Sequence, residues 1–344
     1  MVRFFNWWGT DNSSDNIQDH WFKEFFERCC ADFVDADHQK ICLYTVFGSP
    51  YVLTQTDKSC ANIFFTGENT NVMHTQYADE LQFARYMDAV CSFFTKTPKS
   101  IRFPLWLTYW RFQTDGLFKI PSTSGRNGKA IIVSNHSANG LRTHVVEALQ
   151  TYDIEIECNR ADVFPMCKQV DVGSGSRGKI ETLKSYKYNI CCENSLSEGY
   201  TTEKLFEALA GGCVPIYFGN DPVEPKVLQQ QNIVFITKMN PQDITNRTLD
   251  AANVWTPDAL VHIYATYLQL WSVVKLKLGI KKMKETNTMF VDYECTSKED
   301  AMEKLVIHWK HFSNFFTPRA KFHLEGQTYF MEDFAGDMYE KYRI

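Results

Sequence analysis

Two charged side chains, Glu203 and Lys204, lie in the first turn of a helix that the sequence predicts over Thr201–Ala210. Thr201 or Thr202 is expected to cap this helix, because a threonine hydroxyl can accept a hydrogen bond from a free backbone N–H. Four such N–H groups and the positive end of the helix dipole form a natural binding site for a diphosphate. Lys204 would add a point charge for phosphate. Adjacent helix residues point in different directions, so Glu203 is expected to face another part of the ligand, such as a sugar; a role confined to the helix dipole is the alternative.

This predicted helix lies between two predicted strands. Tyr188–Cys192 is apolar and rich in strand-forming residues, the polar loop Glu193–Tyr200 follows it, and Val214–Phe218 resumes the sheet after a turn at Gly211–Gly212. Ligands of open α/β sheets bind at the carboxyl ends of strands. The loop Glu193–Tyr200 is therefore where we expect contacts with a ligand.

The whole stretch resembles the signature of the family 10 glycosyltransferases, the α-1,3/α-1,4-fucosyltransferases. Their pattern is roughly F-E-N-S, a short variable loop, Y-x-T-E-K, a helix, and V-P-I-Y-x-G. Here it stands as the segments Cys192–Ser195, Tyr200–Lys204 and Val214–Gly219. Cys192 replaces the usual aromatic residue at a predicted buried strand position, where we expect only an effect on packing.

Three shorter segments agree with this resemblance in the same chain order. Ser134–Arg142 looks like the S-N-x-x-x-x-x-x-R element that follows the first strand of the family's donor domain. Phe65–Asn69 looks like the F-x-T-G-E-N loop of the first domain, and Asn6–Gly9 looks like the N-W-W-G start of the bacterial members. The resemblance runs from about residue 3 to about residue 240, and nothing is carried over to the last hundred residues.

The resemblance implies an α/β fold of GT-B architecture, in which two Rossmann-like domains face a cleft and the second binds the donor. It also implies an inverting fucosyltransferase that uses GDP-β-L-fucose and needs no metal or other cofactor. The partners are then a nucleotide sugar and a glycan acceptor, with O3 of a GlcNAc as the expected target. Inversion by single displacement needs a general base on the acceptor hydroxyl and stabilisation of the leaving diphosphate.

Two glutamates are the candidate catalytic residues. Glu68 is the candidate general base, because it follows a predicted strand in a loop of the acceptor domain and a carboxylate is ionised at neutral pH. The alternatives are a solvated loop residue or a residue that only binds acceptor hydroxyls. By resemblance, Glu203 lies at the fucose, where its charge or hydrogen bonds would steady the transition state.

The candidate donor-binding residues centre on two cations. Arg142 lies near the start of a predicted helix and can bind phosphate bidentately, and Lys204 completes the diphosphate pair; the alternative is that both are surface cations. Asn194 and Tyr200 are expected to contact the donor through amide and phenol, unless Asn194 only closes its own loop. The further donor candidates are Ser195, Ser134 and Asn135.

Three other sequence features bear on alternative functions. Asp35 and Asp37 form a D-x-D, the metal motif of another glycosyltransferase fold, but they follow a predicted helix rather than lie in a donor loop. The glycine run Gly173–Gly178 is predicted as a flexible loop, with contact to the guanosine or ribose, aided by Arg177, as the alternative. No G-x-G-x-x-G follows a strand and opens a helix, which disfavours a dinucleotide oxidoreductase.

The elements that must position these residues form two predicted α/β units. We expect residues 1–125 to be the acceptor-binding domain and residues 126–344 the donor-binding domain with C-terminal helices, joined near the linker-like Ile120–Lys129. The first unit is expected to contain the apolar run Val2–Trp7, the helix Asp15–Ala31 and the strands Gln39–Phe47, Ala61–Thr66 and Tyr86–Phe94. The second is expected to contain the strands Ala130–Val133, Ile154–Glu157 and Ile233–Ile236, the helix Asn139–Leu149 and a long helix from Pro257 to about Lys284.

Composition narrows the class of protein further. The chain has 344 residues and a formal net charge of −5, so it lacks the basic footprint of a nucleic-acid binder. No run of about 18 apolar residues predicts a membrane span, and the opening residues lack the pattern of a secretory signal. Eleven irregularly spaced cysteines favour reduced, buried thiols.

These features favour a cytoplasmic enzyme of a bacterium or a virus-infected cell; a Golgi location would need an anchoring partner or an excised domain. The rival functions are another GT-B nucleotide-sugar transferase and a non-catalytic sugar-binding module on the same fold. The acceptor, the linkage and the oligomeric state stay open at this point.

Overall fold

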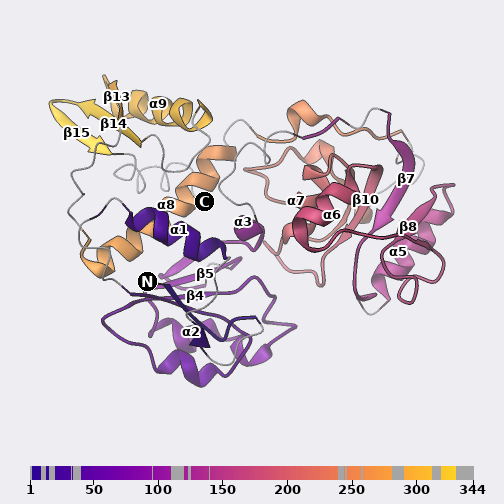
Figure 1. The fold of residues 1–344 in the computed structure, drawn as a ribbon, viewed down its shortest axis with the longest axis horizontal. Coiled ribbons are helices and arrows are strands. Elements are labelled where there is room, and N and C mark those ends of the chain that lie inside the picture. The colour runs from indigo at the N-terminus through magenta and orange to yellow at the C-terminus, as the bar shows by residue number, and fades with distance from the viewer. Residues whose placement is uncertain are drawn as a thin grey trace. The chain divides into compact units, whose positions relative to one another are not determined.

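The computed structural model describes residues 2–8, 13–14, 20–31, 33, 40–94, 96–109, 120–122, 125–138, 140–238, 244, 246–256, 259–280, 290–311 and 319–330. The chain divides into two compact units, of which one combines residues 1–114 with 258–344 and the other comprises residues 115–257 (Figure 1). Each unit is described separately below.

The first unit is built on a six-stranded sheet in the order β2-β1-β3-β4-β5-β6. All strands are parallel except the short edge strand β2, which pairs antiparallel with β1. The loops after the parallel strands therefore leave from one edge of the sheet. The strands are β1 (Val2–Phe5), β2 (Ser13–Ser14), β3 (Ile41–Tyr44), β4 (Ala61–Phe65), β5 (Ala89–Ser92) and β6 (Ser100–Arg102).

Both faces of this sheet are covered, as a run of buried strand residues requires. Phe64 and Phe65 are successive residues of β4 and pack on opposite faces, Phe64 on Phe83 with ring centroids 4.5 Å apart and Phe65 on Phe22 at 4.9 Å. Helices α1 and α8 therefore lie on one side of the sheet and α2 on the other (Figure 1). The helical segments are α1 (Trp21–Cys30), η2 (Pro50–Thr54), η3 (Thr75–Tyr77), α2 (Glu80–Ala84), α3 (Trp106–Tyr109) and α8 (Ala259–Leu278).

The C-terminal segment corrects the predicted domain boundaries. Helix α8 packs against β4 and β6, and Tyr267 on this helix donates a hydrogen bond to the carbonyl of Leu107 at 3.1 Å. Residues from 258 onward therefore belong to the first unit, although the sequence assigned all of residues 126–344 to the second. In the described part of the chain, no helix combines the length and the apolar character that a membrane span needs.

A small three-stranded sheet completes the first unit. Strand β14 pairs parallel with β13 and antiparallel with β15, and helix α9 packs on β14. Phe322 and Leu324 are buried. The bounds are β13 (Phe290–Glu294), α9 (Lys298–His311), β14 (Arg319–Leu324) and β15 (Gln327–Phe330).

The second unit has an all-parallel sheet in the order β12-β11-β10-β7-β8-β9. This is the doubly wound order of dinucleotide-binding folds, and the chain direction across the sheet reverses between β7 and β10. Ligands bind such sheets outside the carboxyl ends of the strands at this switch point. The strands are β7 (Asn127–Ile132), β8 (Ile156–Cys158), β9 (Lys168–Gln169), β10 (Tyr186–Cys192), β11 (Val214–Phe218) and β12 (Val234–Phe235).

The helices of this unit include one that the sequence did not predict. Helix α6 begins at Gly175, inside the stretch Gly173–Gly178 that was predicted as a flexible loop. A Cβ at Gly173 would lie 2.7 Å from the backbone of Gly178, so glycine is needed here for a close backbone approach rather than for flexibility. The helical segments are α5 (Leu141–Gln150), α6 (Gly175–Leu183), α7 (Glu203–Ala210), η4 (Gln230–Asn232), η5 (Ile236–Lys238) and η7 (Ala251–Asn253).

The expected fold class is confirmed: the protein is α/β, with a Rossmann-like sheet in each unit whose strands are parallel apart from the edge strand β2. All eleven cysteines lie in the described part of the chain, and none of them forms a disulfide there.

Candidate functional site

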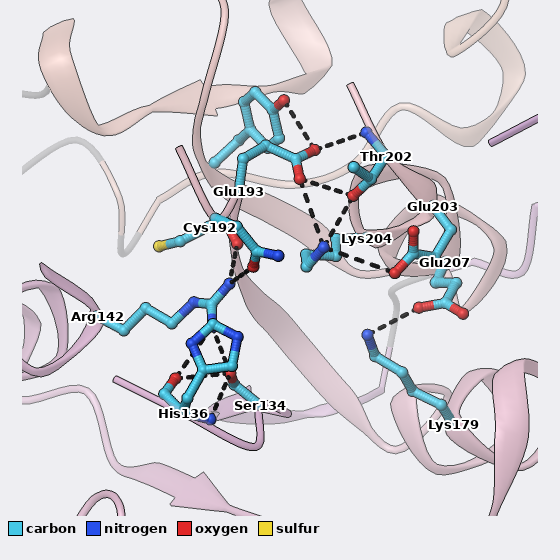
Figure 2. Close-up of polar contacts among 12 residues, drawn as sticks. Ser134, His136, Arg142, Lys179, Cys192, Glu193, Thr202, Glu203, Lys204 and Glu207 are labelled. Atoms are coloured by element: carbon cyan, nitrogen blue, oxygen red, sulfur yellow. Dashed lines mark hydrogen bonds and ion pairs between the residues drawn. The ribbon is translucent and has the colours of Figure 1, made fainter. Parts of the chain in front are cut away.

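Arg142, on the first turn of α5, joins the two strand ends at the switch point of the second unit (Figure 2). Its guanidinium donates to Ser134 Oγ at 2.6 Å and to the carbonyl of His136 at 3.0 Å, both after β7. It also donates to the carbonyl of Cys192 at 2.9 Å and to Asn194 Oδ1 at 2.8 Å, at the end of β10. Burial lowers the pKa of Arg142, but a guanidinium remains a cation at neutral pH. Arg142 therefore places a fixed positive charge between the two loops.

Glu193, directly after β10, anchors the start of α7. Its fully buried carboxylate accepts hydrogen bonds from Thr202 N at 2.8 Å, Thr202 Oγ1 at 2.6 Å and Tyr217 Oη at 3.1 Å. Thr202 is the N-cap residue as predicted, but its hydroxyl donates to Glu193 and makes no cap bond. A protein carboxylate therefore already binds one of the N–H groups expected for a diphosphate, that of Thr202. A diphosphate site at the remaining N–H groups of this helix end stays a prediction.

Lys204 lies in the first turn of α7 among polar oxygens. Its ammonium donates to Thr202 Oγ1 at 2.9 Å and lies 3.5 Å from Glu193 Oε2 and 3.6 Å from Glu203 Oε1. Burial lowers the pKa of Lys204, but the neighbouring charges of Glu203 and Glu193 outweigh it and leave the pKa above its ordinary value. With a side chain only 20% exposed, Lys204 is a charged and partly desolvated cation.

Glu203 carries an oxygen that lacks a partner. Its Oε2 is buried, and no described residue donates a hydrogen bond to it. Burial raises the pKa of Glu203, but the charges of Lys204 and Lys179 outweigh it and hold the pKa below its ordinary value. The carboxylate is therefore ionised at neutral pH. A buried oxygen without a donor is unfavourable, and a ligand hydroxyl would supply the missing donor.

A second ion pair, which sequence reasoning missed, lies beside these residues (Figure 2). Lys179 on α6 lies 2.7 Å from Glu207 on α7, with side chains 15% and 5% exposed. Burial raises the pKa of Glu207, and the charge of Glu203 one turn earlier acts in the same direction. Glu207 had one signal in the sequence, as an acid among the apolar residues that follow the first turn of its helix, whereas Lys179 directly follows a segment predicted as a loop.

A cavity of about 480 Å³ opens beside Lys179, at the carboxyl ends of β7, β8 and β9 and the start of α6. This volume is typical of sites for small molecules. Lys179 also lines a recess of about 10 Å³ together with Arg142 and Lys204, so the cavity and the cations are neighbours. The polar lining of the larger cavity includes Asn135, Asn159, Asp171, Ser174 and Lys179.

The structure brings most of the predicted donor residues together in the second unit. Ser134, Asn194 and Arg142 form one hydrogen-bonded group, and Asn135 is exposed at the cavity. Tyr200 is buried in its loop, and Ser195 is half-buried.

Glu68 belongs to the first unit, in the loop after β4. It is half-buried, and its backbone N–H donates to Thr66 Oγ1 at 3.1 Å while the Thr66 hydroxyl donates to its carbonyl at 3.3 Å. Asp35 and Asp37 lie outside the described residues. The roles of all these residues remain predictions.

Comparison with known families identifies the chain. The model for "Glycosyltransferase family 10 (fucosyltransferase) C-term" matches residues 124–295, which is half of the sequence. The chain belongs to glycosyltransferase family 10. The matched range contains the three cations Arg142, Lys179 and Lys204, which we call the cation cluster, whereas Glu68 lies outside this range.

Matches to individual relatives are short. A fucosyltransferase-like protein of Arabidopsis thaliana is 35% identical over 95 residues, which is 28% of this chain and 17% of that protein. The α-(1,3)-fucosyltransferase of Helicobacter pylori is 40% identical over 52 residues, or 15% of this chain and 11% of that enzyme. The chain thus spans less than a fifth of the length of these relatives.

A similar solved structure is that of an α1,3-fucosyltransferase with GDP-fucose. It has a TM-score of 0.44 and 16% identity, over 72% of this chain and 79% of that chain.

Proposed function

We propose that this family 10 chain transfers L-fucose from GDP-fucose to a hydroxyl of a glycan, with inversion at the anomeric carbon and without a metal. The expected target is O3 of a GlcNAc residue. The observation that carries the proposal is the meeting of three cations, Arg142, Lys204 and Lys179, beside the cavity of about 480 Å³ in the second unit.

Lys179 and Lys204 have different roles in donor binding. Lys179 borders both the large cavity and the recess with the other two cations, so a nucleoside in the cavity directs its diphosphate toward them. Lys204 is the direct phosphate ligand, because an ammonium held by one hydroxyl and two longer carboxylate contacts can exchange a partner.

Arg142 has a different role from the bidentate contact expected from the sequence. The four hydrogens on its terminal nitrogens are matched by four acceptors of the protein: Ser134, His136, Cys192 and Asn194. Arg142 therefore holds the two loops together and contributes positive charge to the diphosphate site, rather than donating a bidentate pair of hydrogen bonds to a phosphate.

The transfer itself is a single displacement. The acceptor oxygen attacks the anomeric carbon of fucose, the bond from that carbon to the β-phosphate oxygen breaks, and the electron pair leaves with GDP. Glu68 takes the proton of the attacking hydroxyl, and the cations stabilise the charge that develops on the diphosphate. The unpartnered Glu203 Oε2 accepts a hydrogen bond from a fucose hydroxyl.

The test is a donor panel with product analysis. The protein is incubated with N-acetyllactosamine and GDP-fucose, GDP-mannose, UDP-GlcNAc or UDP-galactose, with and without EDTA, and nucleotide release and product mass are followed. GDP-fucose should be the preferred donor, and EDTA should leave the rate unchanged.

Three outcomes contradict this proposal. Faster turnover of a different donor would indicate another nucleotide-sugar transferase. GDP binding in calorimetry without turnover of any donor would indicate a sugar-binding module. Loss of activity in EDTA that manganese restores would indicate a metal site.

A further inference from the structure

The buried ion pair of Lys179 and Glu207 lies where helices α6 and α7 pack, beside the candidate donor site (Figure 2). The Lys179 ammonium lies 2.7 Å from Glu207 Oε2, and only 5% of the Glu207 side chain is exposed. Lys179 also lines both the cavity of about 480 Å³ and the recess that contains Arg142 and Lys204. Its ammonium therefore already has a carboxylate partner at the point where a diphosphate is expected to bind.

Packing alone does not account for a carboxylate at this position. The residues of α7 that follow its first turn, Leu205–Ala210, are all buried, and Glu207 is the one charged residue among them. Because two buried charges lose their hydration, apolar residues of similar volume often stabilise a helix interface at least as well as an ion pair does. The geometry thus points to a role for the charge of Glu207 itself.

The charges of the site balance before a donor binds. The cation cluster carries three positive charges, and three glutamates lie beside it: Glu193, Glu203 and Glu207. The diphosphate of GDP-fucose brings two further negative charges and has no proton that titrates near neutral pH. Like charges repel strongly in a partly desolvated site. The occupied site is therefore stabilised when one of the carboxylates takes up a proton.

Glu207 is the carboxylate best suited to take this proton. Glu193 is held as an acceptor by three hydrogen bonds. Burial raises the pKa of Glu203, but the charges of Lys204 and Lys179 outweigh it and leave that pKa below its ordinary value. Burial also raises the pKa of Glu207; the charge of Lys179 opposes this and that of Glu203 adds to it, so this pKa lies above its ordinary value.

The other groups around Glu207 leave its charge dependent on two neighbours. Helix α6 presents Lys179 to it, and α7 itself presents Glu203 one turn earlier. Strand β10 adds Cys191, which also senses the charge of Lys179, and β11 adds Tyr217. Burial raises the pKa of this thiol and of this phenol well above the ordinary values, so both are neutral at neutral pH.

We propose that Glu207 is a positioning residue that acts through Lys179, an assignment that rests on the proposed function. In the free protein the carboxylate holds the ammonium beside the cavity. When the diphosphate binds, Glu207 takes up one proton from solvent and Lys179 keeps its own. The Lys179 ammonium then pairs with phosphate oxygens and becomes a second phosphate ligand beside Lys204. Donor binding is therefore linked to proton uptake, and the affinity for the donor rises as the pH falls.

This linkage differs from what a purely structural ion pair would give. Uptake of one proton lowers the Kd about tenfold for each unit by which the pH falls, as long as Glu207 is ionised in the free protein and protonated in the complex. Glu207→Gln resembles the protonated side chain, so it should bind the donor tightly at every pH. A structural role predicts the reverse, a loss of affinity at every pH.

Calorimetric titration of the whole chain with GDP-fucose between about pH 5.5 and pH 8 tests the proposal. The Kd of the unaltered protein should be about tenfold or more lower at the acidic end. Titration in buffers of different ionisation enthalpy should show proton uptake. Glu207→Gln should bind at about pH 8 as tightly as the unaltered protein does at about pH 5.5, with less than about a twofold change across the range.

Glu181→Gln is the matched control. Glu181 on α6 pairs with Lys184 over the same 2.7 Å, but the side chains are 70% and 44% exposed. This variant should keep the pH dependence of the unaltered protein. His136→Asn should keep it as well; burial and two neighbouring cations lower the pKa of His136, and a linkage that disappears in this variant would assign the proton to His136 and overturn the role of Glu207.

Three further results would overturn this role. They are binding by the unaltered protein without proton uptake, an unchanged pH dependence in Glu207→Gln, and a loss of affinity at every pH in a Glu207→Gln protein that thermal unfolding shows to be folded. The first needs no variant, so it decides the matter even if Glu207→Gln does not fold.

Fucosyl transfer separates this proposal from the function on which it rests. Proton-linked binding of GDP-fucose that depends on Glu207, without transfer to any glycan, would refute the proposed function and leave the role of Glu207 intact. Transfer of fucose with pH-independent donor binding would refute the role of Glu207 alone. The absence of GDP-fucose binding at any pH would refute both.

Discussion

Replacing Lys204 with methionine removes one charge from the candidate diphosphate site and keeps most of the side-chain volume. The ammonium lies 2.9 Å from Thr202 Oγ1 and within 3.6 Å of two carboxylates, with a side chain 20% exposed. A hydrogen bond to a charged group contributes about 1.5–3 kcal/mol, so the Kd for GDP should rise about 10- to 150-fold in Lys204→Met.

The assay is calorimetric titration with GDP and with guanosine. Guanosine has no phosphate, so its affinity should change by less than about twofold in Lys204→Met if the lysine acts on the diphosphate. Lys184→Met is the matched control, because Lys184 is an exposed lysine at the C-terminal end of α6. It should leave both affinities unchanged, and thermal unfolding should show that both variants are folded.

Two results would refute this reasoning. An unchanged GDP affinity in Lys204→Met would mean that the ammonium serves only Glu193 and Glu203. Equal losses of GDP and guanosine affinity would mean that Lys204 holds the cavity in shape without binding phosphate.

Three further predictions concern both units. Glu68→Gln should lower the rate of fucosyl transfer by about 10²- to 10⁴-fold without changing GDP affinity, and unchanged turnover would exclude Glu68 as the base. Gly173→Ala should weaken GDP binding, because the new Cβ would lie 2.7 Å from the Gly178 backbone and displace the start of α6. Gly128→Ala, where a Cβ meets nothing within 4 Å, is the control, and equal affinity in all three proteins would contradict this prediction. Burial lowers the pKa of His20 from 6.5 to about 4. Between pH 6.5 and 4 the His20 imidazole is therefore protonated in the unfolded chain but neutral in the folded chain. Stability should therefore be full above pH 6.5 and fall by about 3 kcal/mol as the pH drops to 4. His20→Asn, which can still accept from Phe22 N, should lose this dependence in urea unfolding; identical pH profiles would refute it.

The sheets could be predicted from the sequence because buried parallel strands are continuous apolar runs. Ala61–Thr66 was predicted as a strand and β4 spans Ala61–Phe65, and Val214–Phe218 was predicted and is β11. The candidate donor loops followed from the same logic, since they lie at the strand ends where such folds bind ligands.

Helix α6 could not be predicted because its first residues, Gly175 and Ser176, are poor helix formers. Packing stabilises it instead: Leu183 is buried beside Ile131 and Tyr186, and α6 also contacts α7. Tertiary contacts therefore override the local preference.

The ion pair of Lys179 and Glu207 could not be predicted from the sequence for a related reason. Its partners are 28 residues apart and meet only when α6 and α7 pack. Glu193 was visible as a letter of the signature, but not as the acceptor that binds the backbone N–H and the hydroxyl of the N-cap residue Thr202. Side-chain competition of this kind depends on three-dimensional proximity, which spacing alone does not give.

A crystal structure of the protein with GDP-fucose tests the central claim most directly. We expect a β-phosphate oxygen within about 3.2 Å of Lys204 Nζ, the guanosine in the cavity beside Ser174, and a fucose hydroxyl donating to Glu203 Oε2. A nucleotide bound elsewhere, with Lys204 still held only by Thr202 and the two glutamates, would contradict it.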